Sequence, residues 1–334
     1  MENNTTEVEN DVSVDDGELT MPDGTLFGVE FWGISRHELI GGAAMAFLSN
    51  RARTEVERIL APINKIGLED IAGWADRLRG AIPNPDPETT AFLADNRNRT
   101  RGTWHYVNLP HGVSGYSREE YPQFTRSDDV VQMIRHCVLV LKGESDRFSE
   151  LNALRWLTHL VGDVHQPIHV GCGYLDESSN PARLVFDPEF ITENNLDHDR
   201  GGNRIKLPNA GSLHSFWDSR LLPEDEADEP QADEPTAAGE SDFDNTDADV
   251  SPELKKRFIQ KLVDRVKSKS LDAADAAEAD EPASDLDGLP PEDWATVWAT
   301  DSIRHARQAY QSLRIVENLP NGDFRVEWEG REAY

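Results

Sequence analysis

Apolar residues recur every three or four positions over several stretches of the chain, which is the spacing of one face of an α-helix. The clearest stripe lies in 148–163, where Leu151, Leu154, Leu157 and Leu160 follow this spacing. Similar stripes predict further helices over 36–60, 68–80, 128–142, 212–222, 251–269 and 292–314. Helices therefore account for most of the regular structure that the pattern predicts.

Breaks in the apolar pattern mark the expected loops and turns. The segment 83–98 is polar and rich in proline, so we expect a loop there, and Pro167 limits the clearest helix. An Asn-Gly dipeptide at 321–322 separates the short segments Arg314–Val316 and Phe324–Trp328, a pattern typical of a β-hairpin. The expected fold is mainly α, a helical, bundle-like single domain with a short β-hairpin.

The chain is strongly acidic, with 33 basic and 63 acidic residues and a formal net charge of −30. Such a charge repels polyanions at long range, which argues against a nucleic-acid coat or scaffold protein. It does not exclude an enzyme, because bound metal ions can dominate the local field. We expect residues 1–31 to be an acidic leader that is disordered or removed, and we interpret 223–250 and 271–291 as solvated acidic insertions in a domain covering 32–334.

The two cysteines do not belong to a cysteine-rich motif. Cys137 and Cys172 can form one disulfide or lie as two buried apolar side chains, and we favour the second interpretation. No apolar run approaches the length that spans a membrane, so we predict no membrane insertion. Residues 1–31 lack the basic and apolar segments of a recognisable signal peptide, so the residues alone leave the compartment open.

Histidine and aspartate are concentrated between positions 159 and 169, in the sequence His-Leu-Val-Gly-Asp-Val-His-Gln-Pro-Ile-His. His159 and Asp163 are four residues apart, so they share one face of a leucine-rich helix. Burying an unpaired imidazole and carboxylate is unfavourable, and a metal ion bound by both would offset that cost. His169 lies beyond Pro167 and can turn back toward the same place. For this pair alone, we favour the other interpretation, a buried His–Asp hydrogen bond at the end of a helix.

The same spacing occurs a second time, because His214 and Asp218 are also four residues apart, in Leu-His-Ser-Phe-Trp-Asp. Two helices that each offer His-x-x-x-Asp meet the requirement of a site for several metal ions. Asp76, His105 and His37 are weaker candidates, since each of them alone has an ordinary structural explanation. Ligands drawn from His and Asp without Cys favour catalytic over structural zinc.

Together these residues resemble the single-strand-specific zinc nuclease family to which mung bean nuclease belongs, a family related to bacterial zinc phospholipase C. The resemblance covers most of 32–222, with a fainter similarity at Trp294–Tyr310. It rests on six motifs in the family's order: Trp32-Gly33 with His37, Trp74-Ala75-Asp76, Trp104-His105-Tyr106, His159 to His169, Asp199-Arg200-Gly201-Gly202-Asn203, and Leu213-His214 with Trp217-Asp218.

The resemblance implies a zinc phospholipase C-like helical fold that holds three zinc ions. By the family pattern, one ion is bound by Asp76, His105, His159 and Asp163, and a second by His169, His214 and Asp218. The third is bound by His37, by the shared carboxylate of Asp163, and by the amino group and carbonyl of Trp32. The resemblance also implies catalytic roles for Asp163, Asp76 and Arg79, the last of which would face the phosphate; a plain salt bridge is the alternative for Arg79.

The activity implied by the resemblance is that of an endonuclease which cleaves single-stranded DNA and RNA to 5′-phosphate products and also acts as a 3′-nucleotidase. Its partners would be single-stranded nucleic acid or nucleotides as substrates, with no stable protein partner, and it would be secreted or periplasmic. Two alternatives stay open. One is a phospholipase C-like phosphodiesterase with the same metals, and the other is a catalytically impaired zinc-binding protein.

Three departures from the family pattern stand out. Trp32 is internal, whereas the family uses an amino group exposed by removal of a leader, so we predict cleavage between Phe31 and Trp32. Asn108 stands where the family has an aspartate, and a carboxylate that could pair with Arg79 is therefore missing. The chain ends at Tyr334, whereas relatives usually continue into another helix.

Overall fold

The computed structural model describes residues 34–80, 82–208, 211–219, 252–276, 286 and 288–328. The chain divides into two units, Met1–Glu30 and Phe31–Tyr334, and all of the described residues belong to the second. The predicted leader 1–31, the candidate ligand Trp32 and the acidic segment 223–250 lie outside the described residues.

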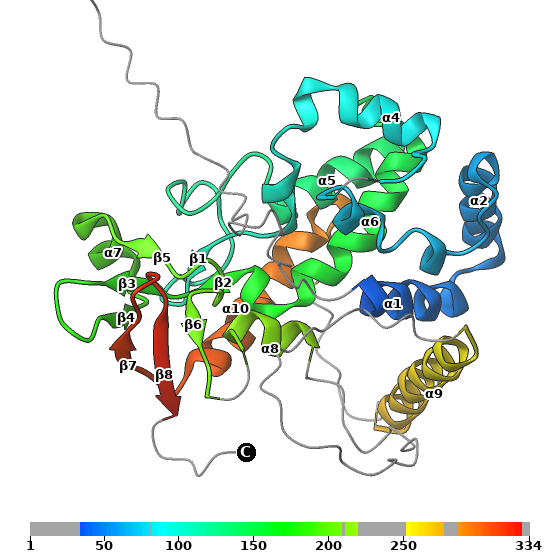
Figure 1. Ribbon diagram of the computed structural model, residues 1–334. Helices are drawn as coiled ribbons and strands as arrows, with labels where there is room; N and C mark the ends of the chain where they lie inside the picture. The colour runs from blue at the N-terminus through cyan, green and yellow to red at the C-terminus, as the bar shows by residue number, and fades with distance from the viewer. Residues whose placement is uncertain are drawn as a thin grey trace, which may run out of the picture. The chain divides into compact units, whose positions relative to one another are not determined.

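The described residues are mainly helical, which confirms the predicted fold class (Figure 1). The α-helices are α1 (Ile34–Phe47), α2 (Asn50–Leu60), α3 (Trp74–Arg77), α4 (Pro87–Ala94), α5 (Val130–Leu141), α6 (Glu150–His165), α7 (Pro188–Asn194), α8 (Leu213–Ser219), α9 (Pro252–Ala276) and α10 (Trp294–Tyr310). Short 3-10 turns join several of them: η1 (Ala61–Ile63), η2 (Leu68–Asp70), η3 (Asn96–Asn98), η4 (Arg101–His105), η5 (Pro167–His169) and η7 (Pro291–Asp293).

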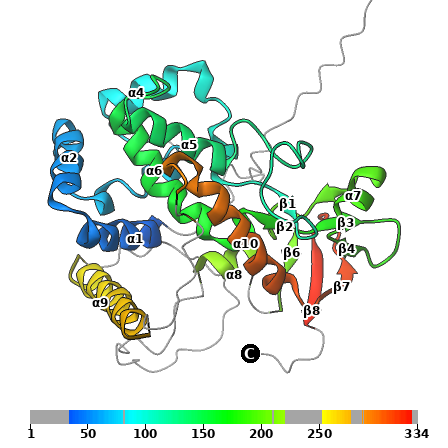
Figure 2. The ribbon, with the colours of Figure 1, turned by 180° about the vertical axis from the view of Figure 1, so that it is seen from behind.

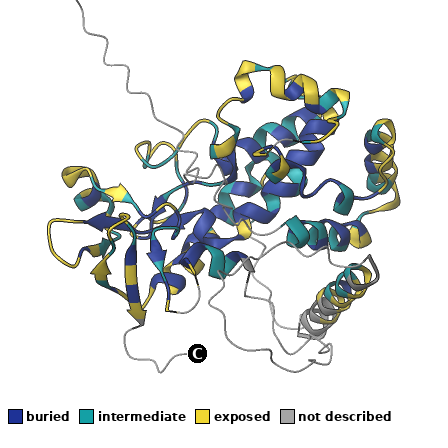
Figure 3. Ribbon diagram, viewed as in Figure 1, coloured by how far each residue is buried: buried dark blue, intermediate teal, exposed yellow. Residues whose placement is uncertain are grey.

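Helix α6 is the centre of the domain and contacts α1, α2, α3, α4, α5 and α10 (Figure 2). Ser149 begins the helix, because its side chain accepts a hydrogen bond from the backbone N–H of Asn152. Pro167 follows the end of the helix, as predicted. Most residues of α6 are buried, as Figure 3 shows, while Leu157, Thr158, Val161 and His165 share a face that is partly exposed. Polar side chains on this helix must therefore find partners inside the protein.

The largest apolar cluster packs α5 and α10 with α6. Trp104 and Trp156 are fully buried in it, with ring centroids 4.9 Å apart. Asp129 begins α5, because its side chain accepts a hydrogen bond from the N–H of Gln132. Cys137 lies in this cluster, Cys172 lies in another, and both thiols are free and buried, as our preferred interpretation held.

The prediction of one continuous helix over 36–60 is wrong. The structure has α1 and α2 there, because the side chain of Ser49 accepts a hydrogen bond from the N–H of Ala52 and begins a new helix. The predicted helix over 68–80 is also wrong, since only the turn η2 and the single-turn helix α3 form.

The predicted loop over 83–98 contains helix α4 and the turn η3. Asp86 accepts a hydrogen bond from the N–H of Thr89, and Pro87 occupies the first helical turn, where its missing N–H costs no hydrogen bond. The proline that suggested a loop is therefore part of a helix start. The helix predicted over 292–314 ends at Tyr310, because Leu313 begins a strand.

In the part of the chain that the structure describes, the strands are short and form three small sheets: β1 (Leu109–Pro110) with β2 (Gly171–Cys172); β4 (Arg183–Val185), β3 (Tyr174–Asp176) and β5 (Asp197–His198); and β6 (Ile205–Lys206), β8 (Phe324–Trp328) and β7 (Leu313–Asn318). The antiparallel pair β7 and β8 is the predicted hairpin, and Gly322 in its turn has a φ of +83°. The parallel pairing of β6 with β8 connects the hairpin to the middle of the chain, which local sequence did not predict.

Helix α9 extends to Ala276, seven residues beyond the predicted range of 251–269. The first part of the predicted insertion 271–291 is therefore helical, while 277–285 lie outside the described residues. Helix α9 packs against α1, and an added Cβ at Gly42 would lie 2.4 Å from Cδ1 of Ile259, so this glycine permits the close approach. Among the described helices, none combines the length and apolarity needed to cross a membrane.

Candidate metal centre

Helix α6 supplies the two central side chains of the site. His159 and Asp163 lie one turn apart on the same face of the helix, and both are buried. Nε2 of His159 is 3.2 Å from Oδ2 of Asp163. The spacing of four residues thus places an imidazole and a carboxylate side by side, as the sequence predicted.

The other candidate side chains come from elements that are separate in the sequence. His37 lies in α1, Asp76 in α3, His105 in η4 and His169 in η5, while α8 carries both His214 and Asp218. All of these side chains are buried or nearly so. The structure therefore brings together every predicted ligand that it describes; Trp32 lies outside the described residues.

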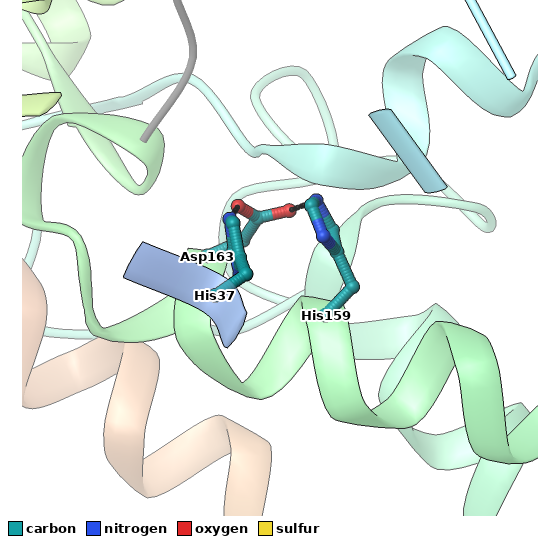
Figure 4. Close-up of side chains that lie close together, drawn as sticks. All are labelled: His37, His159 and Asp163. Atoms are coloured by element: carbon teal, nitrogen blue, oxygen red, sulfur yellow. Dashed lines mark ion pairs between the residues drawn. The ribbon is translucent and has the colours of Figure 1, made fainter. Parts of the chain in front are cut away.

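Asp163 is the carboxylate around which four histidines gather. Its Oδ1 lies 3.4 Å from Nε2 of His37 and 3.3 Å from Nδ1 of His169. Its Oδ2 faces His159 and lies 3.0 Å from Nδ1 of His105. Figure 4 shows the carboxylate between His37 and His159. Each carboxylate oxygen of Asp163 thus lies near a different pair of imidazole rings.

The described ligand atoms fall into three groups, and within each group they lie within 4.8 Å of one another. The groups are His37, His159 and Asp163; Asp76, His105 and His159; and His169, His214 and Asp218. His159 belongs to the first group because its ring stacks on that of His37, with centroids 3.7 Å apart. This differs from the family pattern, in which His37 shares an ion with Asp163 and Trp32 only.

Several buried polar atoms of the cluster have no hydrogen-bond partner among the described residues. They are both ring nitrogens of His37, both carboxylate oxygens of Asp76, Oδ1 of Asp163 and Oδ2 of Asp218. Buried polar groups are normally satisfied, and neighbouring carboxylates repel one another. Cations bound by imidazole nitrogen and carboxylate oxygen would remove both costs, so the donor set fits zinc.

The electrostatic surroundings give the histidines different pKa values. Burial and the charge of Arg79 lower the pKa of His105 to about 4. Burial also acts to lower the pKa of His159, but the charges of Asp163 and Asp76 outweigh it and raise this pKa to about 9. Although burial opposes ionisation of Asp163, the neighbouring histidines hold its pKa well below the ordinary value. The carboxylates therefore favour positive charge at the centre of the cluster, which protonated histidine or a bound metal cation can supply.

Backbone carbonyls orient two of the histidines. Nδ1 of His159 donates to the carbonyl of Ala72 at 2.8 Å, and Nδ1 of His214 donates to the carbonyl of Gly201 at 2.8 Å. Nε2 of each ring therefore faces the cluster and, once deprotonated, can bind a metal ion.

The turn that holds His214 depends on two glycines. Gly201 and Gly202 have φ values of +59° and +81°, and an added Cβ at Gly201 would lie 2.9 Å from the carbonyl oxygen of Ile168. The N–H of Gly202 donates to Oδ1 of Asp199, whose Oδ2 accepts a hydrogen bond from Tyr310 at 2.5 Å. Helix α10 is thus connected to the turn that presents the carbonyl to His214.

Sequence reasoning missed two supporting residues. Gln166 is fully buried, and its side-chain amide donates to Oδ1 of Asp218 at 2.7 Å while its oxygen accepts from the N–H of Ile168. Gly162 packs closely against the ring of His37, because an added Cβ would be 2.7 Å from Nδ1 of that ring. The position of Gln166 and Gly162 within the histidine-rich segment was the available signal, but their contacts are with distant elements.

Two arginines lie within electrostatic range of the cluster. Arg79 interacts electrostatically with Asp76 and Asp163, and its Nη2 donates to the carbonyl of Gly102 at 3.5 Å. Arg36, which the sequence analysis did not single out, feels the charge of Asp218. Asn108, the departure noted above, lies 3.3 Å from Nε2 of His198 through its side-chain amide.

Comparison with known proteins identifies the family. A model of the S1/P1 nuclease family matches residues 32–322. Nuclease S1 from Aspergillus oryzae is 21% identical over 274 residues, which cover 81% of this chain and 74% of that protein. Endonuclease 2 from Arabidopsis thaliana is 23% identical over 208 residues, and nuclease P1 from Penicillium citrinum is 24% identical over 195 residues.

The alignments with these last two relatives each cover 58% of the relative's length, so the chain spans somewhat more than half of them. The family match includes every candidate ligand from Trp32 to Asp218. The family is zinc-dependent, which agrees with the donor set of the buried cluster. The chain therefore belongs to the S1/P1 nuclease family of phosphodiester hydrolases, the family that also contains mung bean nuclease.

Proposed function

We propose that the protein is an endonuclease that cleaves single-stranded DNA and RNA to 5′-phosphate products and also removes 3′-phosphates from nucleotides. The observation that carries the proposal is the buried cluster around Asp163 and Asp218, in a chain of a nuclease family. The names of the relatives support the nuclease activity, while strand preference and product polarity follow from the resemblance.

The proposed cofactor is a set of three zinc ions. Asp76, His105, His159 and Asp163 would hold one; His169, His214 and Asp218 a second; and His37, Asp163 and Trp32 a third. Zinc bound in this way supplies a water of lowered pKa and positive charge for the phosphoryl oxygens. The unsatisfied atoms of His37, Asp76, Asp163 and Asp218 support this assignment.

The chain's own residues would orient the substrate. Arg79 and Arg36 flank the cluster and would bind the oxygens of a phosphate, stabilising the charge that grows as the ester bond breaks. The ligands are buried, so the phosphate must enter a recess to reach them. A single strand can bend into such a recess more easily than a duplex, which supports the proposed strand preference.

We also propose that the protein acts outside the cytoplasm, secreted or periplasmic, with no stable protein partner. Resemblance to the family is the ground for this proposal. Fractionation of the native host, with detection of the protein in the medium or periplasm, tests the compartment.

The decisive experiment combines metal analysis with substrate comparison. Purified protein should contain zinc and should hydrolyse single-stranded DNA and RNA much faster than duplex DNA, leaving 5′-phosphate ends. A clear preference for phosphatidylcholine would instead favour a phospholipase C-like phosphodiesterase. Bound zinc without hydrolysis of any of these substrates would favour an impaired zinc-binding protein.

A further inference from the structure

Positive charge is concentrated in one helix of this acidic chain. The 25 residues of α9 contain four acidic residues and seven basic ones: Lys255, Lys256, Arg257, Lys261, Arg265, Lys267 and Lys269. Helix α9 therefore carries a net charge of +3, while the whole chain carries −30. A local reversal of sign on this scale creates a surface that attracts polyanions where the rest of the molecule repels them.

The apolar side of α9 is covered by α1. Ile259 lies against Gly42 of α1, and Val263, one turn further, is buried. At the same side of the helix, Lys255 forms an ion pair with Glu38. The spacing of four residues shows that this side of α9 packs on the domain and leaves the opposite side toward solvent.

The solvent side of α9 is the cationic one. Lys256, Arg257, Lys261 and Lys267 are all exposed, together with the polar residues Gln260, Asp264 and Ser268. Lys256 and Lys267 are eleven residues apart, about 16 Å along the helix axis at ~1.5 Å per residue. That length is sufficient to follow several phosphates of an extended strand.

The start of α9 lies close to the metal centre. Glu38 follows the candidate ligand His37, and it pairs with both Lys255 of α9 and Arg77 of α3. Arg77 in turn follows the candidate ligand Asp76. Figures 1 and 2 both show α9 beside α1, the helix that carries the candidate ligand His37.

The composition of the exposed side favours nucleic acid over a membrane surface. A helix that lies in a membrane interface presents bulky apolar residues to the lipid. In α9 the apolar residues Ile259 and Val263 face α1, and Val266 is the large apolar residue of this helix that stands out as exposed. Phe258, Leu262 and Val266 form a partly exposed apolar line at the edge of the packed side, whereas the side that carries Lys256, Arg257, Lys261 and Lys267 is polar, which suits the phosphate backbone of nucleic acid.

We propose that the solvent side of α9 is an accessory binding surface for the backbone of a single-stranded polynucleotide, beyond the phosphate that is cleaved. This inference rests on the proposed nuclease function. It assigns α9 a role in holding long substrates, while short substrates do not reach it. The surface raises the affinity for polymers and leaves the chemical step unchanged.

The test compares two triple variants of the zinc-loaded protein. In Lys256→Gln/Lys261→Gln/Lys267→Gln the packing residues of α9 stay intact. The matched control, Arg304→Gln/Arg314→Gln/Arg325→Gln, removes the same charge from exposed positions on α10, β7 and β8. Binding of a 20-nucleotide phosphorothioate strand is measured by fluorescence anisotropy against salt concentration, and KM and kcat are measured for a 20-nucleotide strand and for a dinucleotide.

The α9 variant should bind the strand about tenfold more weakly at low salt, and its salt slope should be shallower by about 2, since each phosphate contact contributes about 0.7. Its KM for the long strand should rise, with kcat and the dinucleotide kinetics unchanged. Equal weakening in both variants, or none in the α9 variant, would overturn the inference. Loss of binding to anionic phospholipid vesicles, with strand binding unchanged, would do the same and point to a membrane surface.

Failure of the proposed function gives a different result. If the unmodified protein cleaves neither the long strand nor the dinucleotide, the nuclease proposal fails. The anisotropy measurement still reports whether α9 binds a polynucleotide, because it does not depend on cleavage.

Discussion

Asp163 lies among four histidines of the metal centre, with Oδ1 near His37 and His169 and Oδ2 near His105 and His159. Asp218 occupies a more peripheral position, where it lies beside His214 and His169 and accepts a hydrogen bond from Gln166. In the proposed assignment Asp163 is shared by two zinc ions and Asp218 binds one, so the two carboxylates offer a direct comparison.

Replacing Asp163 by alanine should remove two zinc ions per molecule, while Asp218→Ala should remove one. The reason is that a shared carboxylate compensates the charge of two neighbouring cations. Zinc per molecule, measured by elemental analysis on folded protein, distinguishes the two variants. A loss of one ion in both would contradict the bridging role of Asp163.

Gly162 is a residue whose importance lies in the space it leaves. An added Cβ would lie 2.7 Å from Nδ1 and 2.9 Å from Cε1 of His37, and a ring packed between helices cannot move away freely. We expect Gly162→Ala to displace His37, lower zinc content and reduce hydrolysis by about tenfold or more. Gly80→Ala is the control, because an added Cβ there meets nothing within 4 Å. Full zinc content in Gly162→Ala would show that α1 adjusts without loss.

Among the elements, α10 supports the metal centre from a distance. Its Tyr310 donates to the buried Asp199, which holds the N–H of Gly202, and the adjacent Gly201 carbonyl orients His214. Burial raises the pKa of Asp199 to about 6. The carboxylate is thus held in an unfavourable environment at neutral pH, where the tyrosine hydroxyl stabilises it.

Tyr310→Phe should cost about 1–3 kcal/mol of stability, because it leaves a buried carboxylate with one hydrogen bond fewer. It should also weaken zinc binding at the group of His169, His214 and Asp218, by tenfold or more. Tyr116→Phe is a matched control, since Tyr116 donates to the buried Asp129 in the same way. Both variants should melt at lower temperature, and equal zinc retention in the two would exclude the proposed connection from α10.

Boundaries of the elements show where local patterns are insufficient. The stripe over 148–163 predicted α6 well, because its apolar spacing and its cap at Ser149 agree. The pattern over 36–60 missed the break at Ser49, since apolar periodicity continues across it. Proline at 87 was interpreted as a loop signal, although with Asp86 before it the same residue begins a helix.

At the scale of the whole molecule, we expect zinc binding and folding to be coupled. Three carboxylates and five histidines converge from α1, α3, η4, α6, η5 and α8. Without cations the carboxylates repel one another, and the ring nitrogens of His37 and the oxygens of Asp76 lack hydrogen-bond partners among the described residues. Removing zinc with a chelator should therefore lower stability by about 4 kcal/mol for each site, relative to protein with zinc at 1,000 times the Kd of that site. Thermal melting measures this loss, and added zinc should restore it. An unchanged melting temperature after complete zinc removal would contradict the coupling.

Processing near residue 32 is a second prediction for the whole molecule. An internal peptide nitrogen is a poor ligand because its lone pair is delocalised, whereas a free amino group with a pKa of about 8 can bind zinc. We expect the active form from the native host to begin at Trp32, as N-terminal sequencing or intact mass would show. Trp32 lies outside the described residues. Fully active protein with three zinc ions that retains residues 1–31 would refute the prediction.

Local sequence was sufficient for the helical class and for the two pairs His159 with Asp163 and His214 with Asp218, because helix periodicity alone places residues four apart on one face. The family motifs added His37, Asp76 and His105, which their own surroundings did not distinguish. Only the packing of distant segments brings these residues together with the α6 pair. The same packing places Gly162 against His37, Gln166 against Asp218 and Tyr310 against Asp199. Contacts between distant segments depend on how the helices pack around α6, and no local spacing contains that information.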